Sequence, residues 1–403
     1  MRKTAGSLCV LFLAGFATPS CHAQVTQVNG SFQVQKARAR NLGIPFDGAP
    51  GPLNAITDVP GVEVGFTTLI SGSGPLKVGE GPVRTGVTAI LPRGKHNIDP
   101  VYAAWFSQNG NGEMTGTTWI DEGGFLAGPV AITNTHSVGT VRDTMIAWGL
   151  KHGVVGDAWS LPVVAETFDG YLNDINGFHV HPEHVIAALD SAHSGPVEEG
   201  NVGGGTGMVC YGFKGGTGTA SRLLSKEMGG YTVGVLVQCN CGRRPQLTIA
   251  GVPVGKEIPD GTPYAKLDQL PGTEAAGDVG SIIIVIATDA PLLPHQLKRL
   301  ARRATLGLAR TGSTSGNGSG DIFIAFSTAN PNADKAPGPN TVQTVSNDRI
   351  SPIFTATVEA TEEAIVNAMV GAETMTGRDN HTVPALPHDQ LQQVLKKYNR
   401  RLD

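Results

Sequence analysis

Polar, glycine-rich segments alternate with short apolar segments along most of the chain, and the sharpest boundary lies between Gly280 and Ser281. A polar loop, residues 271–280, stands before it, and one of the most apolar runs in the sequence, residues 281–287, follows. A short apolar run of this kind, bounded by a glycine, predicts a buried strand. Ser281 is then either an ordinary serine that satisfies a backbone group or a nucleophile at the end of a rigid strand.

The same pattern predicts the remaining elements. Short apolar or alternating runs between turn residues predict strands at 62–70, 83–92, 130–135, 162–167, 231–240, 281–288 and 321–326. Helical spacing of apolar residues predicts helices that begin near residues 138, 182, 293, 352 and 387. Residues 107–121 and 245–280 are predicted to be loops, and residues 200–220 are a glycine-rich stretch. Since strands and helices do not alternate strictly, two mixed sheets covered by helices fit better than a doubly wound parallel sheet.

Composition narrows the class of protein. The 403 residues carry a net charge of −4 and no long basic segment, which argues against nucleic acid or a membrane surface as a partner. The 54 glycines follow no period and lie at turns, so collagen-like and linker sequences are excluded. The pattern is typical of a strand-rich enzyme with many tight connections.

The first 23 residues have the three parts of a secretory signal peptide. Arg2 and Lys3 are the basic part, residues 8–17 are the apolar part, and residues 21–23 are the small-residue cleavage site. The apolar part is too short to span a bilayer, no other run is long enough, and the residues before Cys21 match a lipid-attachment site poorly. The sequence therefore predicts a mature protein, residues 24–403, that is periplasmic and has no membrane partner.

Three cysteines remain after the predicted signal peptide: Cys210, Cys239 and Cys241. An odd number leaves at least one of them unpaired within the chain, and we expect buried or partly buried free thiols. The Cys-x-Cys pair is a weak indication of a metal because no further ligand stands at zinc spacing. His179 and His181 lack a carboxylate at a telling spacing and suit structural or substrate-channel roles better. No metal site is predicted.

Hydroxyl chemistry is the remaining possibility, because the chain has no Gly-x-Ser-x-Gly elbow, phosphate-binding loop or zinc-protease helix. A serine hydroxyl needs a base to become a good nucleophile. If the chain is cut between Gly280 and Ser281, the new α-amine, with a pKa near 8, can serve as that base. Ser281 can make the cut itself by attacking the carbonyl of Gly280, since glycine tolerates a strained backbone.

Four further side chains are candidates for the other functions that such a site needs, and each also has an ordinary structural explanation. Ser319 and Asp321 stand two apart at a strand start, where the carboxylate can orient the hydroxyl; otherwise they belong to a capped turn. The amide of Asn240 can donate to an oxyanion, or it is a turn asparagine. Glu166 lies in an apolar strand and needs a cationic partner, which is either a substrate ammonium or an internal Arg or Lys.

At these residues the chain resembles a known family, the exported bacterial β-peptidyl aminopeptidases, and their relatives, the L-aminopeptidase D-Ala-esterase/amidases. The resemblance runs from about Arg38 to the C-terminus. The segments that carry it are NLGIPF at 41–46, ITDVPGV at 56–62, NGNGEMTG at 109–116, PVVAET at 162–167, GGGTGM at 203–208, GSII at 280–283, DAPLLP at 289–294 and GNGSGD at 316–321.

The resemblance implies an α+β fold, a four-layer αββα sandwich similar to N-terminal-nucleophile hydrolases. It implies one catalytic domain that cuts itself into an α chain, residues 24–280, and a β chain, residues 281–403, and that assembles into a homo-oligomer of αβ units. By position, Ser281 matches the nucleophile, Ser319 and Asp321 its supporting pair, Asn240 the oxyanion donor, and Glu166 the carboxylate that binds the substrate amine. The resemblance implies no cofactor.

Two positions depart from the family pattern. Asp321 stands where some β-peptidases carry Glu; it is one methylene shorter but keeps the charge. Relatives that favour L-amino acids carry a Tyr two residues after the amine-binding Glu, where this chain has Phe168, which has no hydroxyl to donate. This difference favours β-peptide substrates.

The sequence therefore predicts a periplasmic serine aminopeptidase that removes N-terminal residues, including β-amino acids, from peptides, amides and esters that have a free amine. One alternative is an L-aminopeptidase and D-amino-acid esterase or amidase that acts on α-residues. Another is acyl transfer, as in the similar ornithine acetyltransferases, although these have Thr at the junction. A third is an exported binding protein without chemistry.

Overall fold

The computed structural model describes residues 25–28, 31–34, 36–97, 99–153, 159–263, 280–335 and 338–402. The predicted signal peptide and nearly all of the polar loop before Gly280 lie outside the described residues. The chain divides into two compact units at residue 37. In the first unit, β1 (Val25–Val28) pairs antiparallel with β2 (Ser31–Val34). The second unit begins at Arg38 and holds the elements described below.

Two sheets form the centre of this second unit. The larger has six strands in the order β11 (Gly216–Leu223), β12 (Thr232–Asn240), β13 (Ser281–Thr288), β14 (Gly320–Ser327), β5 (Val101–Gly110) and β6 (Phe125–Leu126). The smaller has four strands in the order β3 (Glu63–Ser71), β4 (Val83–Leu91), β7 (Val130–Asn134) and β8 (Val163–Thr167). Each sheet contains one parallel pair, β13 with β14 and β7 with β8, and is otherwise antiparallel.

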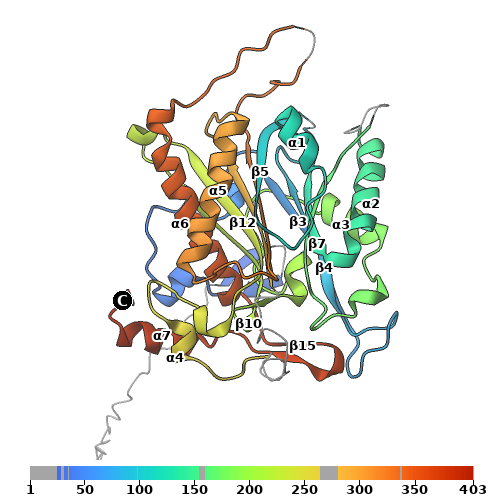
Figure 1. The fold of residues 1–403 in the computed structure, drawn as a ribbon, viewed down its shortest axis with the longest axis vertical. Helices are drawn as coiled ribbons and strands as arrows, with labels where there is room; N and C mark the ends of the chain where they lie inside the picture. The colour runs from blue at the N-terminus through green and yellow to red at the C-terminus, as the bar shows by residue number, and fades with distance from the viewer. Residues whose placement is uncertain are drawn as a thin grey trace, which may run out of the picture. The chain divides into compact units, whose positions relative to one another are not determined.

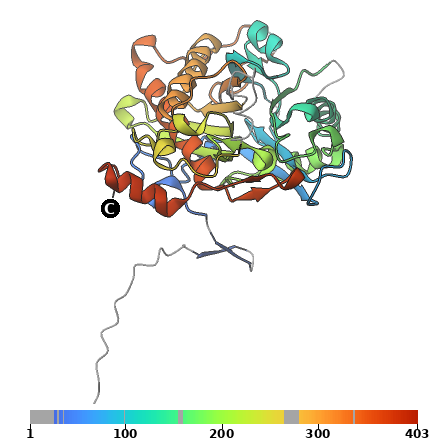
Figure 2. The same ribbon diagram turned by 60° about the horizontal axis from the view of Figure 1, so that its bottom comes forward.

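Helices cover the outer face of each sheet. The helices α5 (Pro294–Arg310) and α6 (Ser351–Val370) pack on the six-stranded sheet, and α2 (Val138–Lys151) and α3 (Pro182–Asp190) pack on the four-stranded sheet. The two helix pairs lie on opposite sides of the sheets in both ribbon views (Figures 1 and 2). The predicted αββα sandwich is therefore confirmed.

The main hydrophobic core fills the space between the two sheets. Apolar residues of β4, β7 and β8 meet those of β12, β13 and β14 there, among them Ile132, Leu236, Ile283, Val285 and Phe326. Every residue of β13 is buried. This explains why its sequence is continuously apolar, since both faces of a central strand in a sandwich are covered.

Shorter elements complete the unit. They are α1 (Thr117–Gly123), α4 (Val254–Glu257), α7 (His388–Lys397), the hairpin of β9 (Val209–Cys210) with β10 (Phe213–Lys214), and that of β15 (Met375–Thr376) with β16 (Thr382–Val383). The predicted loop at 107–121 was partly wrong, because β5 continues to Gly110 and α1 begins at Thr117. Pairing with a distant strand explains why β5 extends into the predicted loop, since β5 pairs with β14 along most of its length.

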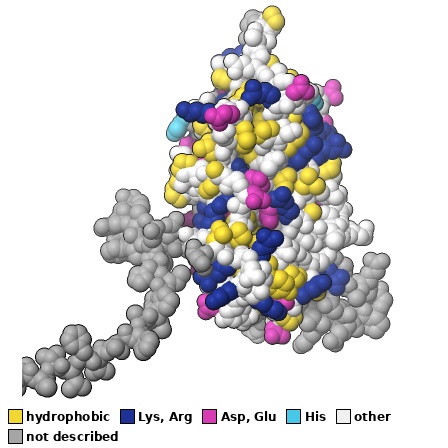
Figure 3. All heavy atoms as spheres, turned by 90° about the vertical axis from the view of Figure 1, so that its left-hand side faces the viewer, with side chains coloured by type: hydrophobic (Ala, Val, Ile, Leu, Met, Phe, Trp, Pro, Cys, Tyr) yellow, Lys and Arg dark blue, Asp and Glu magenta, His cyan; other side chains and the backbone are white. Residues whose placement is uncertain are grey.

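The helix α5 is amphipathic, with an apolar face toward the protein and a basic face toward solvent. Apolar residues of this helix, such as Leu297 and Leu300, are buried, whereas Lys298 pairs with Asp121 at 2.9 Å. Basic, acidic and apolar side chains are mixed on the side of the molecule that Figure 3 presents. No helix in the described part of the chain combines the length and the apolar character that a membrane crossing requires.

Candidate active site

Strand register places Ser281 between Asn240 and the segment that carries Ser319 and Asp321. Ser281 is the first residue of β13 and is only 5% exposed. It pairs with Asn240 at the end of β12 and with Gly320 at the start of β14. Because Gly320 stands between Ser319 and Asp321, one end of the six-stranded sheet collects four of the predicted site residues.

The peptide bond before Ser281 is closely packed. The carbonyl oxygen of Gly280 accepts a hydrogen bond from the N–H of Gly320 at 3.2 Å. A Cβ at position 280 would lie 2.2 Å from the carbonyl oxygen of Asn240 and 2.7 Å from the Cα of Cys241, so any larger residue must displace backbone. Glycine is therefore required here by space, and its carbonyl has a fixed donor.

Ser319 and Asp321 form a hydrogen-bonded pair, as the sequence predicted. The Ser319 hydroxyl donates to Oδ1 of Asp321 at 2.7 Å, and both residues are fully buried. Two asparagines hold the loop before this pair. Asn109 in β5 donates to the carbonyl of Gly316, and Asn111, which directly follows β5, donates to that of Gly318. The pair is thus fixed in place beside the start of β13.

The side chain of Asn240 is oriented at both of its ends. Its Oδ1 accepts from the N–H of Val209 at 2.7 Å, and its Nδ2 donates to the carbonyl of Phe168 at 3.0 Å. An amide nitrogen carries two hydrogens. One is used by Phe168, which leaves the other as the candidate oxyanion donor. The ring of Phe168 is 45% exposed, so this residue meets Asn240 through its backbone.

Glu166 lies near the end of β8 and is almost completely buried, with 3% exposure. Its Oε1 accepts from the N–H of Glu113 at 3.0 Å and its Oε2 from the hydroxyl of Thr135 at 2.5 Å. Burial raises the pKa of the Glu166 carboxyl, and these two hydrogen bonds oppose the rise. Among the described residues no Lys or Arg forms an ion pair with it. The described residues therefore give no support to an internal Lys or Arg as the partner of Glu166.

Gly112 connects the Glu166 carboxylate to the sheet end that carries Ser281. A Cβ at this position would lie 3.2 Å from Oε1 of Glu166 and 3.3 Å from the Cα of Gly320. Since Gly320 pairs with Ser281, a single glycine separates the carboxylate from the strand beside the nucleophile. A buried carboxylate and a candidate nucleophile in such proximity suit a substrate whose reacting carbonyl lies near its free amine.

The prediction of free thiols was wrong for two of the three cysteines. Cys210 and Cys239 form a disulfide, because the contact of β9 with the end of β12 brings their Cα atoms to 5.8 Å. Cys241 is buried and lies outside this bond, with its Sγ 3.9 Å from that of Cys239. The three sulfurs lie within 4.8 Å of one another, a size that would suit a metal ion, but two of them are joined and are not thiolate ligands.

The two histidines named as the best alternative metal ligands have separate partners. His179 pairs with the buried carboxylate of Asp174 at 2.9 Å, whereas His181 is exposed and lies 3.7 Å from Glu183. They therefore do not converge on one position.

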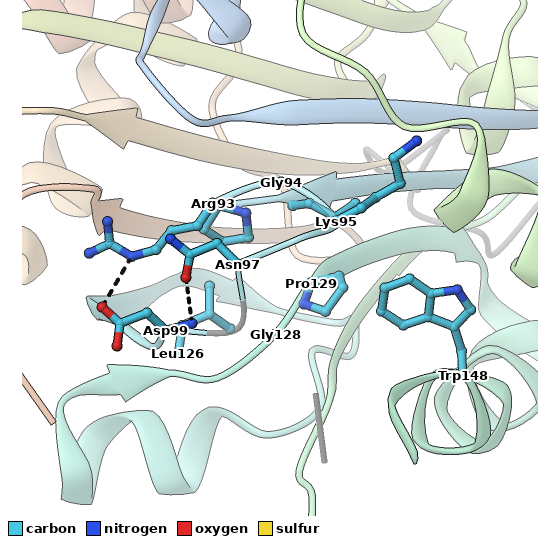
Figure 4. A pocket seen from close by; sticks show the side chains of 11 residues that line it. Arg93, Gly94, Lys95, Asn97, Asp99, Leu126, Gly128, Pro129 and Trp148 are labelled. Atoms are coloured by element: carbon cyan, nitrogen blue, oxygen red, sulfur yellow. Dashed lines mark hydrogen bonds and ion pairs between the residues drawn. The ribbon is translucent and has the colours of Figure 1, made fainter. Parts of the chain in front are cut away.

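A small pocket lies at the other end of the four-stranded sheet (Figure 4). Its walls include Arg93, Lys95, Pro129 and Trp148. Pro129 directly precedes β7, whereas Thr135, which binds Glu166, directly follows it. None of the predicted site residues lines this cavity.

The comparisons with known proteins agree on one group of enzymes. The model of peptidase family S58 matches residues 54–383. The β-peptidyl aminopeptidase BapA of Sphingosinicella microcystinivorans is 57% identical over 381 residues, which cover 92% of this chain and 95% of the relative. BapA of Sphingosinicella xenopeptidilytica is 49% identical over 392 residues, covering 96% and 98%.

Solved structures give the same result. The L-aminopeptidase D-Ala-esterase/amidase of Ochrobactrum anthropi, described as a variant of the Ntn hydrolase fold, superposes with a TM-score of 0.83 at 51% identity, covering 91% of this chain and 99% of its own. A β-aminopeptidase from Burkholderia sp. superposes with a TM-score of 0.80 at 46% identity, covering 91% and 100%.

Proposed function

The chain belongs to peptidase family S58 and is a serine-type aminopeptidase, and from this we propose that it is an exported, self-processing enzyme whose N-terminal nucleophile is Ser281. The observation that carries the proposal is the register of β12, β13 and β14. It pairs Ser281 with Asn240 on one side and, on the other, with Gly320, which stands between the hydrogen-bonded residues Ser319 and Asp321.

Processing proceeds by attack of the Ser281 hydroxyl on the carbonyl carbon of Gly280. The oxygen of that carbonyl gains negative charge, which the N–H of Gly320 is placed to stabilise. The peptide nitrogen of Ser281 leaves with a proton, and an ester joins Gly280 to the serine oxygen. Water then hydrolyses the ester, which yields an α chain of residues 24–280 and a β chain of residues 281–403 with a free α-amine.

Turnover repeats the same chemistry on a substrate. The α-amine of Ser281 accepts the hydroxyl proton, the hydroxyl attacks the substrate carbonyl, and the amide of Asn240 stabilises the oxyanion. Asp321 orients the hydroxyl of Ser319, which relays a proton to or from Ser281. The leaving amine departs with a proton, and water hydrolyses the acyl-enzyme to release the N-terminal residue.

Glu166 selects substrates with a free amine. A buried carboxylate that forms no ion pair with a Lys or Arg in the described part of the chain gains most from an ammonium group that binds beside it. The substrates proposed are peptides, amides and esters, including those with an N-terminal β-amino acid, as the names of the BapA relatives suggest. Action on L-α-residues is the second candidate, which the likeness to the Ochrobactrum enzyme supports. Phe168, which offers no hydroxyl at its position, favours the first candidate, β-amino acid substrates.

We further propose a periplasmic location after signal cleavage within residues 1–23, and assembly of several αβ units.

Denaturing electrophoresis with N-terminal sequencing tests the processing step. The purified protein should give two fragments, one of them starting at Ser281, and Ser281→Ala should give one uncut band and no turnover. The variant Ser315→Ala, which removes a hydroxyl from the loop before β14, serves as the control and should be processed normally. Uncut wild-type protein, or turnover by Ser281→Ala, contradicts the proposal. Assay of a β-dipeptide beside its α-counterpart then separates the two substrate candidates.

A further inference from the structure

Two segments that meet beside Asn240 are joined at three positions. The segments are residues 209–211, in and after β9, and residues 239–241, at the end of β12. The contacts are the hydrogen bond from Val209 N–H to Asn240 Oδ1 at 2.7 Å, the disulfide between Cys210 and Cys239, and the hydrogen bond from Tyr211 N–H to the Cys241 carbonyl at 2.7 Å. The covalent link therefore stands directly next to the hydrogen bond that orients the Asn240 amide.

The two segments differ in how firmly the fold holds them. Cys239 lies within the six-stranded sheet, where β12 pairs with β11 on one side and β13 on the other. In contrast, β9 has two residues and pairs with the equally short β10. A hairpin of this size has little stability of its own. The position of the Val209 N–H relative to Asn240 thus depends on contacts with the rest of the fold, which include this disulfide and the hydrogen bonds that Arg244 donates to the carbonyls of Tyr211 and Gly212.

The same segment also supports the bond predicted to be cut. Gly280 packs so closely on residues 240 and 241 that a Cβ on it would overlap the carbonyl of Asn240. A displacement of this segment would therefore alter both the oxyanion donor and the surroundings of Ser281.

We propose that the Cys210–Cys239 disulfide is a positioning element for Asn240. It keeps the Val209 N–H on Oδ1 of Asn240 and so fixes the direction in which the Nδ2–H group points. The inference rests on the proposed function, because the disulfide acts through the oxyanion donor Asn240 and does not itself contact the substrate. An oxyanion interaction exists only in the transition state, so its loss lowers kcat and leaves KM nearly unchanged.

The variant pair Cys210→Ala with Cys239→Ala removes the link. After normalisation to active sites by the burst of acyl-enzyme, we expect kcat to fall about tenfold and KM to change less than about twofold. Cys241→Ala is the matched control, because it removes a buried sulfur 3.9 Å from that of Cys239 and keeps the disulfide; its kcat should stay near that of wild type. If the alanine pair does not fold, mature wild-type enzyme reduced with a phosphine and alkylated provides the same measurement.

A double-mutant cycle with Asn240→Ala separates positioning from general destabilisation. If the disulfide acts through Asn240, the triple variant should be no slower than Asn240→Ala alone. Three outcomes overturn the inference. The kcat losses of the alanine pair and of Asn240→Ala multiply in the triple variant, the alanine pair keeps its kcat, or a non-reduced digest lacks the Cys210–Cys239 peptide pair. If Asn240→Ala retains full kcat, the oxyanion role and the inference are both wrong. If Asn240→Ala is impaired and the alanine pair is not, the inference alone is wrong.

Discussion

The N–H of Gly320 donates to the carbonyl oxygen of Gly280 at 3.2 Å, and Gly320 is also the residue that pairs with Ser281 across the sheet. The donor, the carbonyl and the hydroxyl proposed to attack it are therefore fixed relative to one another by backbone pairing. A donor held in advance at the oxygen that gains charge needs no rearrangement during the reaction. The proposed processing step thus depends on strand register and on the absence of a side chain at position 280.

Gly280→Ala should slow processing at least tenfold. The added Cβ would lie 2.2 Å from the carbonyl oxygen of Asn240, so the backbone must shift, and such overpacking typically costs about 1–3 kcal/mol. The fraction of cut chain is measured over time by denaturing electrophoresis. Gly139→Ala is the control, since an added Cβ there meets no atom within 4 Å, and it should be processed like wild type. Equal processing rates for the two variants would disprove the steric argument.

Asp321→Asn should lower kcat about 100-fold or more. The change keeps the size of the buried side chain but removes the charge that orients the Ser319 hydroxyl, and proton transfer by positioned groups contributes about 10²–10⁴ in rate. The assay is kcat per active site at saturating substrate. Asp321→Glu restores the carboxylate and should recover part of the activity. If Glu and Asn are equally poor, the position is sensitive to packing and the proposed role of the charge is wrong.

The sequence was sufficient for the elements whose apolar pattern is continuous. The strand predicted at 281–288 coincides with β13, and the proline-led helices begin within a residue or so of their predicted starts. In contrast, β11 carries no apolar pattern although nearly all of it is buried. Its polar groups bond inside the protein, as when Thr219 donates to the carbonyl of Val235 and Ser221 to Asp58. Such a strand has no signal in hydrophobic periodicity.

The candidate site residues were chosen by motif, but their arrangement was not predictable. That Gly112 separates Glu166 from Gly320 follows from the packing of one sheet on the other, which local sequence does not encode. The cysteine pairing shows the same limit. Three cysteines allow several states, and only the contact between β9 and β12 selects Cys210 with Cys239.

Glu166→Gln should weaken substrates with a free amine far more than N-acetylated analogues. A charge-assisted hydrogen bond contributes about 1.5–3 kcal/mol, so kcat/KM for the free amine should fall about 10- to 100-fold. The matched control is Glu113→Gln, which removes an exposed neighbouring carboxylate but keeps the backbone N–H that binds Glu166. Equal losses on both substrate types would instead indicate a structural carboxylate.

The acid side of the pH–rate profile should contain a step from the ionisation of Glu166. Burial raises its pKa above the ordinary value of 4.5, and only the carboxylate form binds ammonium. As pH falls through the raised pKa, kcat/KM should therefore decline at a higher pH than an exposed glutamate would produce. The profile of kcat/KM refers to the free enzyme, so bound substrate does not mask this ionisation. The proposed base, the α-amine of Ser281, ionises near pH 8 and produces its own step on the acid side. Glu166→Gln should keep that step and lose the one at lower pH; an unchanged profile in that variant assigns the lower step to another group.

Asp169 should make the protein less stable as pH rises. It is fully buried, accepts from Nδ2 of Asn173 at 3.0 Å, and burial raises its pKa from 3.8 to about 7. Between these values the folded protein keeps a proton that the unfolded chain releases, so the free energy of unfolding falls with rising pH and levels off above about pH 7. At about 1.4 kcal/mol for each pH unit, the full effect is on the order of 4 kcal/mol.

Urea unfolding of Ser281→Ala, with and without Asp169→Asn, measures this pH dependence of the free energy of unfolding on a single uncut chain. Asparagine cannot ionise, so the Asp169→Asn curve should lack this slope, whatever its absolute stability. Parallel curves for the two proteins would show that Asp169 does not carry a proton in the folded state.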